Sequence, residues 1–328
     1  MKILIAYDGS DCSDTALDDL RRAGLPREGE ALVVSVAEVW LPPPAENENL
    51  NEYIEELQTR PQPFKSYKES AQAIAKTRTL ADRAKSRFET NFPSWSVTSE
   101  ATYGSPAWEI LKRARDFGPD LIVAGSHGRS AFNRLILGSI SQKILTEATC
   151  SVRIARGRVE VDPAPVRILA GFDGSEGAQA AVRALAQRNW REKSEFKLIA
   201  VTDSVTPSTI GRFIPPVARM VEEVNQAERD RIEELAASSL EHLQSAGFEA
   251  KLEIYKGNPK NVLIEEAEKW SADCIFVGAT AYGSRFERFL LGSVSSAVAA
   301  RARCSVEVVR KQTEKVESND GGKHEANL

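Results

Sequence analysis

Short runs of apolar, often β-branched residues recur along the chain and alternate with stretches in which apolar residues return every three or four positions. The first pattern is typical of strands covered on both faces, and the second is typical of helices with one buried side. This alternation predicts βαβ units and parallel sheets with helices on both faces. The expected strands cover residues 2–7, 31–36, 96–102, 120–125 and 151–156, and then residues 166–172, 197–202, 249–255, 274–279 and 305–310.

The second half of the chain repeats the first. ILIAYDGSDCSDTAL at 3–17 returns as ILAGFDGSEGAQAAV at 168–182, and GSISQKILTEATCSVRIAR at 138–156 returns as GSVSSAVAARARCSVEVVR at 292–310. A period of this length indicates a duplicated domain rather than a solenoid unit. We therefore expect a first domain at 1–157, a linker at 158–165, a second domain at 166–310 and a disordered tail at 311–328.

Composition narrows the class of protein. The 328 residues are 42% hydrophobic and 27% charged, which fits about two domains with real cores. The net charge of −4 argues against a general nucleic-acid binder, and no apolar run is long enough to cross a membrane. The four cysteines show no CxxC spacing, so we expect neither a disulfide framework nor a zinc site. MKILIAYDGS is better explained as a first strand than as a signal peptide, and we expect a soluble, cytoplasmic protein.

One irregular stretch follows the second strand in each half, at residues 41–68 in the first and 204–217 in the second. The first is rich in proline and acidic residues, and the second is shorter. Surface loops with some helical turns are one interpretation, and a lid or partner-binding loop is the other. The residues alone do not choose between them.

A glycine pattern follows the fourth strand of the first half. Gly125 and Gly128 are separated by nine residues from Gly138 and Ser139, which open a helix expected at 140–148. Glycine permits positive φ and lets backbone amides approach a ligand closely. A helix N-terminus favours phosphate, so this segment is suited to hold a polyphosphate. It is neither a Walker loop nor a Rossmann fingerprint.

Several side chains of this segment have more than one interpretation. Arg129 and Arg134 are either phosphate contacts or solvated charges. Ser139 is also a plausible N-cap, with Gln142 completing a capping box. His127 is either a loop residue without a role in binding or a phosphate contact, and with no evident acid or nucleophile beside it we expect no catalytic role.

Two tandem copies that open with I-L-I-A-Y-D-G-S and close with G-x2-G-x9-G-S resemble the universal stress protein family. The resemblance covers nearly the whole chain except the long loops and the tail. It implies an α/β fold of two tandem five-stranded parallel-sheet sandwiches of order 3-2-1-4-5, the adenine nucleotide alpha-hydrolase-like fold. In such a sheet the first and fourth strands are neighbours, and their C-terminal ends form the switch point where open α/β sheets bind ligands.

The resemblance also implies a nucleotide site in the first half. Asp8 and Ala6 would hold the nucleoside end, and Val36 would pack on adenine. The phosphates and ribose would fall to the glycine segment, at Gly125, Gly128, Arg129, Gly138, Ser139 and Ile140. The implied cofactor is ATP, with Mg²⁺ or Mn²⁺ carried only by the phosphates, and no protein residue is expected to bind a metal. Asp8 has a structural alternative, which is to close the turn before the helix near Ser10.

The second copy departs from this pattern. The segment Gly278-x4-Gly283-x8-Gly292 carries one extra residue, and Tyr282 falls where Gly128 stands in the first copy. A tyrosine cannot copy the close approach of a glycine. We expect a weakened or empty second site, formed from Asp173, Val201, Gly278, Gly283, Gly292, Ser293 and Val294.

The resemblance implies an ATP-binding sensor or scaffold in a stress response, with an unidentified protein partner and no enzymatic activity. The fifth strands, SVRIA and SVEVV, are expected to cover each other's edge in an internal pseudo-dimer, which leaves room for a further homodimer. One alternative is a slow ATPase or a phosphoryl or adenylyl transferase, which needs a positioned base and a metal. The other is a scaffold that binds no nucleotide and keeps the glycines for tight turns.

Overall fold

The structure is a computed structural model that describes residues 1–39, 52, 65–128, 137–156, 164–202, 215–279 and 291–311. Each strand expected from the sequence is present in these residues, with its ends shifted by at most two positions. The first-half strands are β1 Lys2–Ala6, β2 Glu30–Ala37, β3 Ser96–Tyr103, β4 Leu121–Gly125 and β5 Ser151–Ala155. Those of the second half are β6 Arg167–Gly171, β7 Glu195–Thr202, β8 Ala250–Lys256, β9 Cys274–Gly278 and β10 Ser305–Val309.

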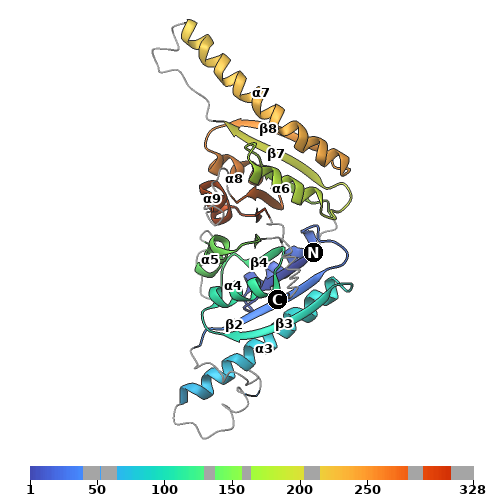
Figure 1. The fold of residues 1–328 in the computed structure, drawn as a ribbon, viewed down its shortest axis with the longest axis vertical. Coiled ribbons are helices and arrows are strands. Elements are labelled where there is room, and N and C mark those ends of the chain that lie inside the picture. The colour runs from blue at the N-terminus through green and yellow to red at the C-terminus, as the bar shows by residue number, and fades with distance from the viewer. Residues whose placement is uncertain are drawn as a thin grey trace, which may run out of the picture.

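The ten strands form one sheet of order β3-β2-β1-β4-β5-β10-β9-β6-β7-β8 (Figure 1). Each half has the expected order 3-2-1-4-5, and every pairing within a half is parallel. The halves meet where β5 pairs with β10 in antiparallel register, with Arg153 opposite Glu307. The apolar edge strand of each half is therefore covered by the other.

Helices cover both faces of the sheet. In the first half these are α1 Asp11–Asp19 with the short η1 Leu20–Arg22, α3 Lys65–Asn91, α4 Pro106–Phe117 and α5 Ser139–Glu147. In the second half they are α6 Glu176–Ala186, α7 Pro215–Ser245, α8 Pro259–Lys269 and α9 Ser293–Arg301. The core beneath α4, α5, α8 and α9 is continuous across both halves, whereas α1 with α3 and α6 with α7 close separate cores on the other face. None of the described helices is long and apolar enough to span a bilayer.

Local signals explain where several helices begin. Ser105 and Asn258 are the N-caps of α4 and α8, each followed by proline, as the sequence predicts. The Asn258 side chain accepts a hydrogen bond from the Lys260 amide at 2.9 Å, whereas Ser105 makes no such bond. The capping-box prediction for Ser139 is wrong: Gly138 is the N-cap of α5, without a side-chain bond, and Ser139 is the first helical residue.

The loops of the sequence analysis end earlier than expected. Residues 65–68 already belong to α3, and residues 215–217 to α7. The remainder of both loops lies outside the described residues, apart from residue 52. The proposed tail beyond residue 311 and most of the proposed linker lie outside them as well.

Candidate functional site

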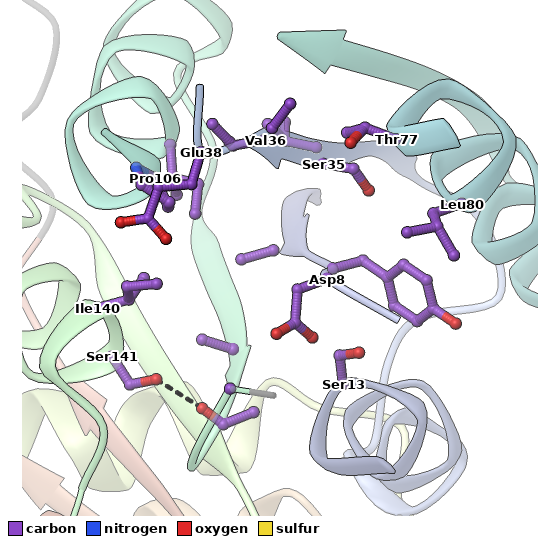
Figure 2. A pocket seen from close by; sticks show the side chains of 18 of the residues that line it. Asp8, Ser13, Ser35, Val36, Glu38, Thr77, Leu80, Pro106, Ile140 and Ser141 are labelled. Atoms are coloured by element: carbon purple, nitrogen blue, oxygen red, sulfur yellow. Dashed lines mark hydrogen bonds between the residues drawn. The ribbon is translucent and has the colours of Figure 1, made fainter. Parts of the chain in front are cut away.

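A cavity of about 490 Å³ lies at the C-terminal ends of β1, β2 and β4 (Figure 2). β1 lies between β2, the next strand in the chain, and β4. This is the topological switch point of the first half, where the two connections leave a crevice. The volume is in the range of small-molecule sites in proteins.

One wall of the cavity is apolar and belongs to the face covered by α4 and α5. Because side chains alternate along a strand, Ala6 and Val36 point to this face together with the core residues Val34 and Ala124. The helices complete this wall with Pro106, Ile110, Ile140 and Ile144. The result is an apolar slot suited to a flat ring.

Asp8 stands next to this slot, directly after β1. Its Oδ1 accepts hydrogen bonds from the Ser10 amide at 3.0 Å and the Ser10 hydroxyl at 2.6 Å. Ser10 is the N-cap of α1, so the structural role considered for Asp8 is real. The other oxygen, Oδ2, lies 3.2 Å from the point where a Cβ on Gly128 would stand. The carboxylate therefore closes a turn and also faces the glycine segment.

The three glycines of the first-half pattern allow neighbouring backbone and side-chain atoms to lie close, and none of them is needed for an unusual backbone conformation. None of Gly125, Gly128 and Gly138 has a positive φ. A Cβ on Gly125 would lie 2.8 Å from the Cys12 carbonyl group, and one on Gly128 would crowd Asp8. The Gly138 amide donates to the Ser126 carbonyl at 2.9 Å, which places the start of α5 beside the end of β4.

His127 is a stronger candidate than its sequence context indicated. The residue is only 8% exposed, and it lines the cavity between Gly125 and Gly128. Its Nδ1 lies 3.0 Å from the Ser126 hydroxyl, and its buried Nε2 has no hydrogen-bond partner among the described residues. Burial lowers the pKa of His127, and Arg156 lowers it further. In the tautomer in which Ser126 donates to Nδ1, the neutral ring carries its proton on Nε2 and offers a donor to a ligand, whereas in the other tautomer Nε2 offers an acceptor.

The structure brings most of the predicted first-half residues together. Six of them line the cavity, namely Ala6, Asp8, Val36, Gly125, Gly128 and Ile140. Gly138 and Ser139 precede Ile140 at the start of α5 without lining the cavity. Arg129 and Arg134 lie outside the described residues. Within the described part of the chain, no group of three His, Cys, Asp or Glu residues is placed to hold a metal ion.

Sequence reasoning missed several polar residues that line the cavity from α1, from α3, from β2 and from the positions just after β1 and β2. They are Tyr7, Ser13, Ser35, Glu38, Lys76 and Thr77. A signal existed for Ser35, which is a polar residue inside the apolar run ALVVSV. For Lys76 and Thr77 there was none, because only the packing of α3 on β2 brings them to the cavity.

The second half repeats part of this arrangement. Asp173 accepts a hydrogen bond from the Ser175 amide at 3.0 Å, as Asp8 does from Ser10. Val201 and Val294 pack against the shared core, and Ser293 is the first residue of α9. Gly278 and Gly292 are tightly enclosed, since a Cβ on them would meet Gly177 at 2.4 Å and the Ala279 carbonyl oxygen at 3.0 Å. Gly283 and Tyr282 lie outside the described residues.

Comparison with known proteins gives a consistent result. The model of the universal stress protein family matches residues 1–156 and again 166–310. A universal stress protein of Mycolicibacterium smegmatis is 29% identical over 191 residues, which covers 58% of this chain and 61%, less than two thirds, of that relative. One from Mycobacterium tuberculosis is 26% identical over 223 residues, covering 66% of this chain and 70% of the relative.

Solved structures show the same fold. A universal stress protein from Archaeoglobus fulgidus superposes with a TM-score of 0.57 at 21% identity, covering 96% of this chain and 97% of that one. A functionally unknown protein from Pseudomonas aeruginosa gives a TM-score of 0.54 at 15% identity, covering 94% of this chain and 92% of that one.

Proposed function

Because the chain belongs to the universal stress protein family, we propose that it binds an adenine nucleotide in the cavity of its first half. We further propose that it acts as a nucleotide-dependent sensor or scaffold in a stress response. The observation that carries the proposal is the cavity itself, which is lined by the apolar slot, by the Asp8 carboxylate and by His127, whose buried Nε2 has no partner among the described residues. Buried polar atoms are normally paired, so Nε2 of His127 is a place for a ligand atom.

The residues present fit such a ligand from end to end. Adenine would lie in the slot between Val36 and Ile140, and Asp8 would accept hydrogen bonds from the ribose. The phosphates would lie along Gly128 toward the start of α5, whose first turn has no side-chain cap. Free amides at a helix N-terminus favour anions, and Nε2 of His127 adds a donor. Mg²⁺ or Mn²⁺, when bound with ATP, would neutralise part of the phosphate charge.

We propose binding rather than turnover as the role of this site. Asp8 already accepts two hydrogen bonds from Ser10, and His127 is engaged through Nδ1 with Ser126. These contacts hold both groups in place for recognition. A nucleotide that touches both the end of β1 and the start of α5 would link these two elements, and a protein partner could read that change.

The test is to count nucleotides per chain by native mass spectrometry after addition of Mg–ATP. We expect one nucleotide per wild-type chain. Gly138→Trp should abolish binding, because the indole would extend from the N-cap of α5 beside His127. Gly292→Trp is the matched control in the second half and should retain one nucleotide. No nucleotide on the wild type, or equal loss in both variants, would contradict the proposal.

A further inference from the structure

The cavity continues past Asp8 onto the face of the sheet covered by α1 and α3. Figure 2 shows Pro106 and Ile140 on one side of Asp8, with Ser13 and Thr77 on the other. We call this second part the hydroxyl chamber and define it by four buried residues that line the cavity, Tyr7, Ser13, Ser35 and Thr77. It is distinct from the apolar slot, because Ser35 and Val36 are neighbours in β2 and point to opposite faces.

The hydrogen bonds of the chamber define what it can accept. Ser13 donates to the Ser10 carbonyl at 2.9 Å, Thr77 donates to the Ala73 carbonyl at 2.9 Å, and Tyr7 donates to Asp14 at 2.8 Å. These hydroxyls have used their protons and offer only lone pairs. Ser35 is 1% exposed, and its hydroxyl has no partner among the described residues.

These donors and acceptors favour one kind of ligand group. A phosphate only accepts hydrogen bonds, and only Ser35 has a free proton to give it. A hydroxyl group can donate to Ser13 or Thr77 and accept from Ser35. The chamber therefore matches a hydroxylated group rather than a second phosphate.

The second half of the chain provides an internal comparison. Alignment of the two repeats equates Asp8 with Asp173 and Val36 with Val201. In the long helices, the spacing of the buried residues aligns positions 77, 81, 84 and 88 of α3 with positions 232, 236, 239 and 243 of α7. The four chamber residues then correspond to apolar residues that are also buried, Phe172, Ala178, Ala200 and Ile232. The fold is thus built without these hydroxyls in the second half, and burying an unpaired hydroxyl costs stability. The hydroxyls of the first half call for an explanation other than packing.

Leu80 and Leu235, at corresponding positions of the two halves, have different surroundings, and Leu235 is 36% exposed. Leu235 corresponds to Leu80, and its Cδ1 lies 2.6 Å from the point where a Cβ on Gly174 would stand. In the first half, Leu80 lines the open cavity. Lys76 of α3 also lines the first-half cavity and is exposed, so a positive side chain stands beside the chamber.

We propose that the hydroxyl chamber binds a second, hydroxylated ring of the ligand, so that the preferred ligand is an adenylate carrying a sugar beyond its diphosphate. This rests on the proposed function, since the adenosine end occupies the apolar slot. Asp8 stands between the two compartments and can accept hydrogen bonds from either sugar.

The experiment compares ADP with ADP-ribose by isothermal titration calorimetry on the full chain. ADP-ribose adds the second ribose to the terminal phosphate of ADP, which also removes one ionisable oxygen, so the ratio of the two affinities is compared between the wild type and the variants. The wild type should bind ADP-ribose about tenfold more tightly, as expected for one or two added hydrogen bonds. Ser35→Ala and Thr77→Ile, which introduce the second-half residues, should reduce this ratio to near one. Ala200→Ser, the reverse change in the second half, should leave the ratio unchanged.

Melting temperature separates this role from a structural one. Because Ser35→Ala removes an unpaired buried hydroxyl, it should keep or raise the melting temperature while it lowers the preference for ADP-ribose. Equal affinities of the wild type for the two probes would overturn the proposal that the chamber binds a second sugar, and would leave the proposal of nucleotide binding intact. Absence of binding to either probe would overturn the proposed function and the chamber together. A lower melting temperature with an unchanged ratio would assign Ser35 to packing and overturn the proposal.

Discussion

Arg153 of β5 and Glu307 of β10 lie opposite each other where the two half-sheets join, with 3.3 Å between Arg153 Nη1 and Glu307 Oε2. Both residues are fully buried. Asp19 of α1 receives two further hydrogen bonds from Arg153, at 2.6 and 3.2 Å, and Arg188 of the second half pairs with the other oxygen of Glu307. Burial acts to lower the pKa of Arg153, but the carboxylates of Asp19 and Glu307 raise it well above its usual range.

The Arg153–Glu307 pair favours a join between a first half and a second half over a join between two identical halves. Positions 153 and 307 are equivalent in the two repeats, so pairing of two first halves would place Arg153 opposite Arg153. Two second halves would likewise bring Glu307 against Glu307. Like charges buried together are costly, and the join is therefore specific for one half of each kind.

Removal of Arg153 should destabilise the chain strongly. Arg153→Met leaves Asp19 buried without its cationic partner and Glu307 with Arg188 alone, and we expect the free energy of unfolding to fall by about 3–5 kcal/mol. The control is Arg167→Met, which breaks an exposed pair with Glu195, also at 3.3 Å, and should cost less than about 1 kcal/mol. Urea denaturation measures both. A loss for Arg153→Met no larger than that for Arg167→Met would show that the buried network contributes little.

His127 should make the protein sensitive to mild acid. A histidine in the unfolded chain titrates near pH 6.5, and burial lowers the pKa of His127 in the folded state. As the pH falls below about 6.5, the unfolded chain therefore gains a proton that the folded protein does not, and stability drops. His127→Gln should reduce the fall in melting temperature between pH 7 and pH 5. His242→Gln, at an exposed position of α7, should keep the wild-type slope, and equal slopes in all three proteins would argue against this assignment.

Gly125 and Gly128 should respond differently to alanine. At Gly125 the new Cβ would meet the Cys12 backbone at 2.8 Å, so Gly125→Ala should cost about 1–3 kcal/mol of stability. At Gly128 the nearest atom is Oδ2 of Asp8 at 3.2 Å, a contact that a shift of a few tenths of an ångström relieves while Oδ1 keeps its bonds to Ser10. Gly128→Ala should therefore fold nearly normally and bind ATP more weakly, as measured by thermal melts and calorimetry. An unchanged ATP affinity in Gly128→Ala would remove that residue from the site.

The four cysteines should differ in reactivity. Burial raises the pKa of Cys150 to about 11 and that of Cys304 to about 12, and it raises the pKa of Cys274 further. Only a thiolate reacts quickly, so these three should resist alkylation in the folded protein. Cys12 and Cys304 are both partly exposed, and because burial disfavours the thiolate of Cys304, Cys12 at the start of α1 should react first with iodoacetamide at pH 8. Peptide mapping checks this, and Cys12→Ser should remove the fast-labelled peptide; uniform labelling of all four in native buffer would contradict it.

The sequence by itself determined the architecture and the family. Apolar runs predicted every strand, because strands covered on both faces need nearly continuous apolar residues. The internal repeat predicted two halves of the same fold, and the spacing of Gly125, Gly128 and Gly138 pointed to the end of β4. Asp8, Val36 and Ile140 followed from the resemblance, and all three line the cavity.

Tertiary structure alone decided how the halves join and what the cavity contains. Arg153 and Glu307 are far apart in the chain, and only the antiparallel pairing of β5 with β10 makes them partners. Ser35 and Thr77 become a chamber only when α3 packs on β2, and His127 gains its role only when burial leaves Nε2 without a partner. The physical reason is the same in each case. Periodicity records which face of an element is buried, whereas hydrogen-bond satisfaction and charge pairing depend on which elements meet there.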